Sequence, residues 1–332
     1  MPQPIIVGFD GSEHGCDALA LGRALAATLS ARLVVVIAYT PEQWLWAPGT
    51  AEPMDQHERE LIVARAEAAF SGKDRVEFRT AASPSAAGAL HAEAERERAQ
   101  IIVVGSSHRG TMGRMLLGTV TQEVLDAAPC AVAVAPPGLA ATREIHFSRV
   151  GVGFDDTPAA HDALAVARFL ARRACAELRL VWAAHLGTRA LPLAATSYVY
   201  PDYFENVRAE VEDRLEQAAA PIREDVSVRA EIVRGQTTDA LIEQSEHLDL
   251  LVLGSRGYGP LKSVLLGSVS RRVVNDARCS VLVVPRGVRN LGDTRQPADA
   301  GASQGGEHTR ARAAMLSDDA TSDESPGAPN SV

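Results

Sequence analysis

Residues 254–268 combine glycines and a hydroxyl in a spacing that indicates phosphate-binding chemistry. The stretch reads Gly-Ser-Arg-Gly-Tyr-Gly-Pro-Leu-Lys-Ser-Val-Leu-Leu-Gly-Ser, after an apolar run at 250–253 and before a helical pattern that begins near Ser268. We expect a buried strand, a loop and a helix N-terminus, where unpaired backbone N–H groups and the helix dipole favour a phosphate. Glycine matters there because a Cβ would hold the phosphates away from the amides.

Other interpretations of this stretch require different residues. A Walker loop needs Gly-Lys-Ser/Thr, which is missing, and residues 254–259 do not have the GxGxxG spacing of a dinucleotide-binding loop. A sharp turn without a ligand would also account for Gly254-x2-Gly257. Against the bare turn, Asp155-Asp156 ends an earlier strand and should open on the same sheet edge. A carboxylate there can accept hydrogen bonds from a ribose or an adenine amine.

Short apolar runs alternate with helical patterns along the chain. In the first part we expect strands near 4–9, 33–39, 75–81, 101–104 and 131–135, and helices near 13–29, 55–70, 84–98 and from Thr119 onward. This alternation indicates βαβ units, and hence a parallel sheet with right-handed crossovers. A mixed sheet is the alternative, because the pattern alone does not determine strand order.

The same order of expected strands and helices is then repeated in the second part of the chain. Residues 151–155 repeat residues 6–10 with an offset of 145, and an offset of 149 relates the pairs Gly105 and Gly254, Gly118 and Gly267, and Cys130 and Cys279. A nearly constant offset over strands and loops indicates a tandem duplication of one domain of about 140 residues. The second copy predicts strands near 149–154, 178–184, 226–233, 249–253 and 280–284, and helices near 158–174, 203–219, 237–247 and 268–277.

These patterns set the expected domain bounds. We expect the first domain at 1–140 and the second at 147–287. The short linker at 136–148 favours packing of the two domains against each other. From 290 to 332 the chain is rich in Gly, Ala, Asp and Ser, with too little apolar surface to offset the entropy of ordering, so we expect a disordered tail.

Composition excludes several classes of protein. The net charge of −9 argues against nucleic acid and anionic membranes as general partners, and no apolar run is long enough to span a membrane. The N-terminus enters a strand without a secretion signal, which favours a cytoplasmic location. The four cysteines have neither CxxC spacing nor zinc-ligand histidines, so we expect reduced thiols, with Cys130 and Cys279 buried, and no metal site. No nucleophile–base pair or carboxylate dyad indicates catalytic residues.

With these features the chain resembles the universal stress protein family, in its tandem two-domain form, over about 1–287. The family motif G-x2-G-x9-G-S/T is complete in the second copy, and the opening Val-Gly-Phe-Asp and the closing run at 280–285 also match. The resemblance implies two Rossmann-like α/β domains, each with a five-stranded parallel sheet in the order 3-2-1-4-5 and helices on both faces. It also implies adenine-nucleotide binding in one subgroup, and dimer pairing through the last strand of each domain. In a tandem chain the two halves would supply this pairing internally, and a homodimer of whole chains stays open.

The resemblance carries ligand roles onto matching positions of this chain. In the second copy it places Asp155 at the ribose or adenine, the backbone of Ala183 at the adenine, and around the ribose and phosphates Gly254, Gly257, Gly267, Ser268 and Val269. The matching positions in the first copy are Asp10, Ala38, Gly105, His108, Gly118, Thr119 and Val120. The implied ligand is ATP, with or without Mg²⁺.

The function that follows is that of a nucleotide-binding stress-response regulator or sensor. One alternative is a scaffold that binds partners without nucleotide, as in the non-binding branch of the family. Another is a slow ATPase, against which the lack of an acid–base pair counts. The intact glycine set at 254–268 favours binding over the scaffold.

The first copy departs from the motif at His108, which stands where the second glycine belongs. If this position is left-handed, a side chain costs roughly 1–2 kcal/mol, or about tenfold in affinity. We therefore predict that calorimetry on residues 1–140 and 147–287 as separate fragments gives weaker ATP binding for the first. Equal affinities would contradict this, and a contact from the His108 ring to a phosphate would explain them.

Overall fold

The computed structural model describes residues 3–41, 54–70, 75–106, 117–142, 144–184, 203–255, 267–288 and 291. These residues belong to one unit, Met1–Asp293. The expected disordered tail falls outside the described residues, apart from Leu291, and so do His108 and Gly257. Among the described helices, none is both long and apolar enough to cross a membrane.

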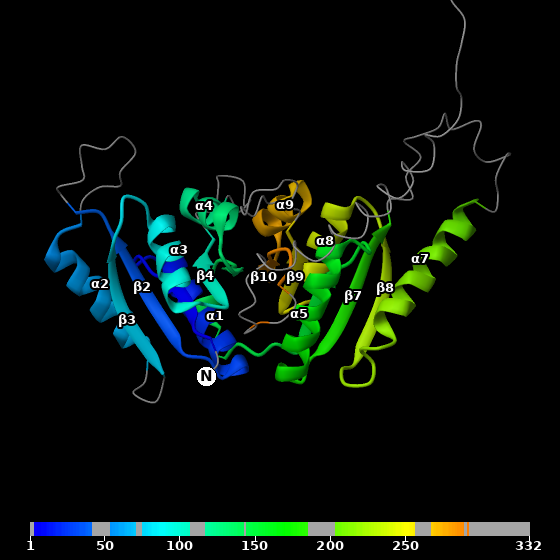
Figure 1. Cartoon of the computed structure of the whole chain (residues 1–332), viewed down its shortest axis with the longest axis horizontal. Helices are drawn as coiled ribbons and strands as arrows, with labels where there is room; N and C mark the ends of the chain where they lie inside the picture. The colour runs from blue at the N-terminus through cyan, green and yellow to red at the C-terminus, as the bar shows by residue number, and fades with distance from the viewer. Residues whose placement is uncertain are drawn as a thin grey trace, which may run out of the picture. The chain divides into compact units, whose positions relative to one another are not determined.

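Each half follows the expected order of strands and helices (Figure 1). The first half comprises β1 (Ile5–Gly8), α1 (Glu13–Leu29), β2 (Leu33–Tyr39), α2 (Gln56–Ala68), β3 (Val76–Ala82), α3 (Ala86–Glu97), β4 (Ile101–Gly105), α4 (Thr119–Ala127) and β5 (Ala131–Ala135). A short 3-10 helix, η2 (Leu139–Ala141), follows. The second half comprises β6 (Arg149–Gly153), α5 (Pro158–Ala174), β7 (Glu177–Ala184), α7 (Tyr203–Ala219), β8 (Val228–Arg234), α8 (Thr237–Ser245), β9 (Leu250–Gly254), α9 (Ser268–Asp276) and β10 (Ser280–Val284).

The ten strands of the described residues form one sheet in the order β3-β2-β1-β4-β5-β10-β9-β6-β7-β8. Within each half the strands are parallel and follow the order 3-2-1-4-5, so the predicted domain fold is confirmed. The halves meet where β10 pairs with β5 in the antiparallel sense, with Val281 opposite Val134 and Val283 opposite Val132. The sheet as a whole is therefore mixed, although each half is purely parallel.

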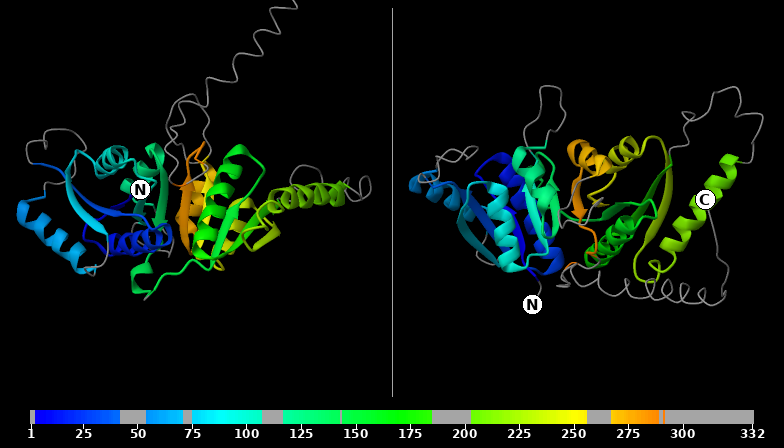
Figure 2. Two further views of the ribbon diagram at one scale, coloured as in Figure 1. Left: turned by 60° about the horizontal axis from the view of Figure 1, so that its bottom comes forward. Right: turned by 45° about the horizontal axis from the view of Figure 1, so that its top comes forward.

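Helices cover both faces of the sheet (Figures 1 and 2). Residues of α1, α2, α5 and α7 join one buried apolar cluster, and residues of α3, α4, α8 and α9 join the other. Successive residues of β1 face opposite clusters, Ile5 and Val7 on one side and Ile6 on the other. Burial on both faces explains why the strands read as continuous apolar runs rather than alternating ones.

The antiparallel junction determines where ligands can approach. In an open parallel sheet, ligands bind beyond the carboxyl ends of the strands. Because the strands of the two halves run in opposite directions, their carboxyl ends lie on opposite edges of the common sheet. Each half therefore presents its own candidate site, and no single small ligand can occupy both.

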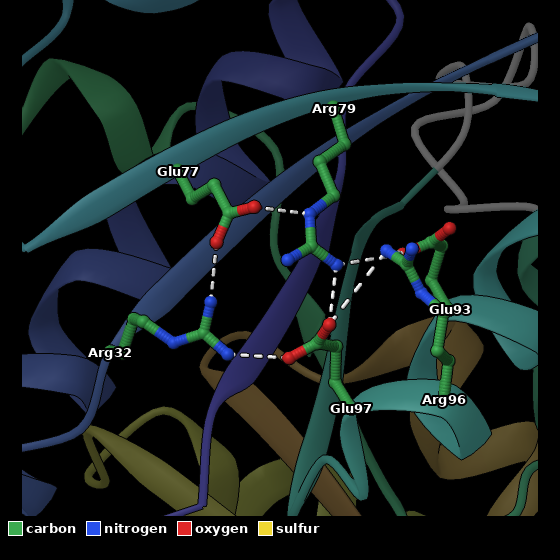
Figure 3. A network of polar contacts seen from close by, with 6 residues as sticks. All are labelled: Arg32, Glu77, Arg79, Glu93, Arg96 and Glu97. Carbon is green, nitrogen blue, oxygen red and sulfur yellow. Dashed lines mark hydrogen bonds and ion pairs between the residues drawn. The ribbon is translucent and has the colours of Figure 1, made fainter.

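An ion-pair network joins β3 and α3 to Arg32, the residue directly before β2 (Figure 3). The Arg79 guanidinium donates hydrogen bonds to Glu77, Glu93 and Glu97, and Arg32 donates to Glu77 and Glu97. The Arg79 side chain is 20% exposed and that of Glu97 is 16% exposed. These partly buried, multiply bonded charges differ from the single surface ion pairs that contribute little to stability.

The network makes a prediction about acid stability. Hydrogen bonds from Arg79 lower the pKa of both Glu77 and Glu97 below the ordinary value near 4.5. A lowered pKa stabilises the fold at pH values above the ordinary pKa, and this contribution is lost as the pH falls through the lowered one. Arg79→Gln should therefore cost roughly 1–2 kcal/mol of unfolding free energy at pH 7, and the difference from wild type should shrink below about pH 4.5.

Urea unfolding followed by circular dichroism between pH 3 and pH 7 measures this difference. Arg278→Gln is the control, because Arg278 is 64% exposed and lies 3.9 Å from its carboxylate partner. It should change stability little at any pH. A difference for Arg79→Gln that is the same at pH 3 and pH 7 would show that the network is not the cause.

Candidate functional site

An acidic turn follows the first strand of each half and is built in the same way twice. One carboxylate oxygen of Asp10 accepts hydrogen bonds from the Ser12 amide at 3.0 Å and from its hydroxyl at 2.6 Å. The corresponding oxygen of Asp155 accepts from the amide and the hydroxyl of Thr157, at 3.3 and 2.6 Å. Ser12 and Thr157 in turn cap α1 and α5. Each carboxylate is thus exposed, and it is oriented by the residue that begins the next helix.

Helices α4 and α9 begin without a side-chain cap. Their N-cap residues are Gly118 and Gly267, and among the described residues neither helix start has a side-chain cap hydrogen bond. By contrast, four other helices begin with an N-cap side chain that accepts an amide hydrogen bond. These N-cap residues are Ser12, Asp55, Ser85 and Thr157. Helix α8, with Gln236 at its N-cap, also lacks such a bond. The first-turn amides of α4 and α9 are therefore available to an anion.

Hydroxyls tie these two helix starts to the ends of the preceding strands. Thr121 donates to the carbonyl oxygen of Gly105 at 2.9 Å, and Ser270 donates to that of Gly254 at 3.1 Å. Both bonds span 16 residues and bridge the glycine-rich segment. The sequence analysis did not identify them. The signal was available as a hydroxyl residue two positions into the helix in both copies.

The glycines that end β4 and β9 are required by packing. A Cβ at Gly105 would lie 2.2 Å from the carbonyl oxygen of His14, and one at Gly254 would lie 2.4 Å from that of Ala159. These carbonyls belong to the first turns of α1 and α5, so backbone rather than a flexible side chain is in the way. Packing alone therefore requires glycine at positions 105 and 254, whether or not a ligand binds.

The structure brings most of the predicted residues of each half to one edge of the sheet. Because β1, β2 and β4 are adjacent parallel strands, their carboxyl ends place Asp10, Ala38 and Gly105 along that edge. In the second half, β6, β7 and β9 do the same for Asp155, Ala183 and Gly254. The residues that start α4 and α9 follow from there, and of these Thr119, Val120 and Ser268 are exposed and Val269 is half-buried.

The acidic turns differ between the halves at their second residue. Gly11 has a φ of 78° and Asp156 a φ of 59°, so both turns use the left-handed region. Asp156 is held there by His161, at 2.8 Å, and by Arg214 of α7, at 3.1 Å. In the first half a Cβ at Gly11 would instead meet the Ile62 side chain at 3.2 Å. The second half therefore has a charged contact between its turn and its outer helix where the first half has an apolar one.

A second pair of aspartates, which the sequence analysis did not identify, holds the segment that follows the last strand of each half. The buried Asp17 accepts hydrogen bonds from the amides of Gly138 and Ala140, at 2.9 and 2.7 Å. The equivalent Asp162 accepts from Gly287 at 2.7 Å. Both glycines have a φ near 80°. These carboxylates anchor the segments that follow β5 and β10, and they are structural rather than parts of the edge site.

The four cysteines are free thiols, and Cys130 and Cys279 are buried as expected. Burial raises the pKa of both Cys130 and Cys279 to about 12, which disfavours the reactive thiolate form. No group of three or more His, Cys, Asp or Glu residues among the described ones is placed to hold a metal ion.

Comparison with known proteins gives one consistent result. The model of the universal stress protein family matches residues 1–136 and 146–285. Universal stress protein Rv2005c of Mycobacterium tuberculosis is 31% identical over 290 residues, which cover 84% of this chain and 96% of that protein. A crystal structure of a universal stress protein from Archaeoglobus fulgidus superposes with a TM-score of 0.59 at 19% identity, covering 86% of this chain and 98% of that one. A shorter universal stress protein chain, solved in complex with cAMP, is 26% identical over 41% of this chain and 98% of its own, with a TM-score of 0.31.

The packing of Gly254 yields a stability prediction. Gly254→Ala should lower the free energy of unfolding by roughly 2–4 kcal/mol, because the new methyl group meets a backbone carbonyl that cannot move alone. Gly153→Ala is the matched control, since its Cβ would meet only the ends of the Leu253 and Leu241 side chains, at 3.0 and 3.4 Å. Thermal unfolding should rank the two variants in that order. Equal stability of Gly254→Ala and wild type would refute the packing explanation.

Proposed function

The chain belongs to the universal stress protein family, and on that premise we propose that it binds ATP and acts as a cytoplasmic stress-response regulator or sensor. The observation that carries the proposal is that the start of α9, which has no side-chain cap among the described residues, and the oriented Asp155 carboxylate lie at the same carboxyl edge of the second half. We assign the main site to this half because its glycine motif is complete. The first half supplies a weaker site.

Phosphate binding is supported by the chemistry at the start of α9. The first-turn amides carry the positive end of the helix dipole, and the exposed Ser268 hydroxyl adds a donor. The Ser270 hydroxyl fixes the helix start against the end of β9, so these donors are oriented before a ligand arrives. Such preorganisation reduces the entropy that binding must overcome.

Adenine binding is supported by the length of β7. This strand runs to Ala184, whereas its neighbour β6 stops at Gly153, opposite Val181. The carbonyl of Val181 accepts the Phe154 amide, and alternate residues of a strand direct their backbone groups to the same side. Ala183 therefore directs its N–H and C=O beyond the end of β6, where an adenine edge could pair with them. Ala38 has the same relation to β1, whose last contact is Phe9 to Val36.

The proposal is one of binding rather than catalysis. Universal stress proteins are stress-response proteins and are generally not enzymes. Among the described residues no cluster is placed to hold a metal, so any Mg²⁺ would arrive with the nucleotide and be held by its phosphates. A scaffold that works without nucleotide is the outcome expected if the chain proves unable to bind ATP.

We also propose that the two halves remain paired in solution through β5 and β10. This pairing would supply within one chain the contact that the family resemblance implies between two single-domain chains. It is supported by the antiparallel ladder and by Arg173 of α5, which donates to the carbonyl of Leu29 in α1 at 3.0 Å. Linkage by a short connection raises the effective concentration of the halves and favours this internal pair.

Native mass spectrometry and calorimetry test these proposals together. We predict one chain per particle, carrying adenine nucleotide, and ATP binding that Asp155→Asn weakens roughly ten- to hundredfold, because hydrogen bonds to charged groups are strong. The asparagine keeps an acceptor for Thr157, so the turn should persist. Asp10→Asn is the matched control and should have a smaller effect. Wild-type protein that neither carries nor binds adenine nucleotide would refute the binding proposal and favour the scaffold.

A further inference from the structure

A side chain of the second half reaches into the candidate site of the first. The Oδ1 atom of Asn275, in the last turn of α9, accepts a hydrogen bond from the Leu117 amide at 2.8 Å. Leu117 is only 7% exposed and directly precedes Gly118, the N-cap of α4. The contact therefore lies where the glycine-rich segment of the first half ends and its proposed anion-binding helix begins.

The direction of α9 explains this contact. The helix starts at Ser268, on the edge that carries the second candidate site, and its nine residues extend about 13.5 Å. Since the two halves run in opposite directions, its far end arrives at the edge that carries the first site. A second contact, from Arg271 to Asp126 at 3.1 Å, joins α9 to the last turn of α4. The two helices thus lie antiparallel, as neighbours over the middle of the sheet (Figure 1).

The chemistry of Asn275 fits this location. A buried amide without an acceptor is costly, and among the described contacts Asn275 supplies the acceptor for Leu117. The residue at the equivalent position of the first half is Asp126, whose carboxylate is neutralised by Arg271. An uncharged carboxamide holds the amide without placing a negative charge beside a helix start that would receive a phosphate. The difference between the copies at this position therefore matches the different tasks of the two side chains.

We propose that Asn275 is a positioning residue for the nucleotide site of the first half, so that this site is completed by the second half of the chain. The assignment rests on the proposed ATP binding. Asn275 acts through the Leu117 amide: it fixes the residue before Gly118, and thereby the direction in which the first amides of α4 point. A first domain separated from the second would keep Gly118 and Thr119 but lose this constraint.

Three variants of the full chain test the proposal. Asn275→Ala removes the acceptor, Asn275→Asp retains an acceptor oxygen, and Arg271→Gln removes the other contact between α9 and α4 while leaving Leu117 held. Hydrogen–deuterium exchange with mass spectrometry is measured at the Leu117 amide, on overlapping peptides that begin at least two residues before Leu117. ATP titration is carried out with Asp155→Asn as the background, so that the first half dominates the signal.

We expect faster exchange at Leu117 in Asn275→Ala, and near-wild-type exchange in Asn275→Asp and Arg271→Gln. ATP affinity in the Asp155→Asn background should fall roughly three- to tenfold with Asn275→Ala and stay unchanged with Arg271→Gln. Unchanged exchange in Asn275→Ala would overturn the proposal, and so would faster exchange without any loss of affinity. An equal loss of ATP affinity with Arg271→Gln would also contradict the proposal, because it would show that any contact between α9 and α4 has the same effect as Asn275.

The design separates this inference from the function on which it rests. If wild-type protein binds no ATP, the proposed function fails, and the exchange experiment still decides whether Asn275 holds Leu117. If wild-type protein binds ATP but the Asp155→Asn background does not, the nucleotide site belongs to the second half alone. The role assigned to Asn275 is then wrong.

Discussion

The antiparallel pairing of β5 with β10 is the contact on which the rest of the structure depends. It converts two parallel sheets into one sheet of ten described strands, and it pairs the backbone groups of two strands that would otherwise be exposed edges. It also reverses one half relative to the other, which separates the candidate sites onto opposite edges and brings the end of α9 to the start of α4. The separation of the two candidate sites and the approach of α9 to the first of them both follow from this ladder.

The fold was predictable because its patterns are strong and occur twice. Continuous apolar runs mark strands buried on both faces, and the repeat offset allowed each copy to support the assignments in the other. The predicted helices at 158–174 and 203–219 agree with α5 and α7 to the residue. How the two sheets join was harder to predict from the residue pattern. Apolar patterning shows that β5 and β10 are buried, but not which strand covers each one.

The site was predictable at the level of elements and less so at the level of atoms. Asp10 and Asp155 lie at strand ends as expected, yet the carbonyls of His14 and Ala159 alone suffice to explain why Gly105 and Gly254 carry no side chain. The glycine motif, which we interpreted as a sign of ligand binding, is therefore also explained in part by packing. Contacts such as Asn275 with Leu117 join residues 158 positions apart, and no local pattern in one sequence reports a bond of that range.

The fused arrangement has a consequence for how this molecule can change over evolutionary time. In a symmetric homodimer every substitution at the interface appears twice, so a residue suited to one side must also be tolerated on the other. Here Asp126 and Asn275 occupy equivalent positions, yet one meets an arginine and the other a backbone amide. Covalent fusion has released these positions from symmetry. The two edges that carry the candidate sites can therefore diverge while the common sheet stays intact.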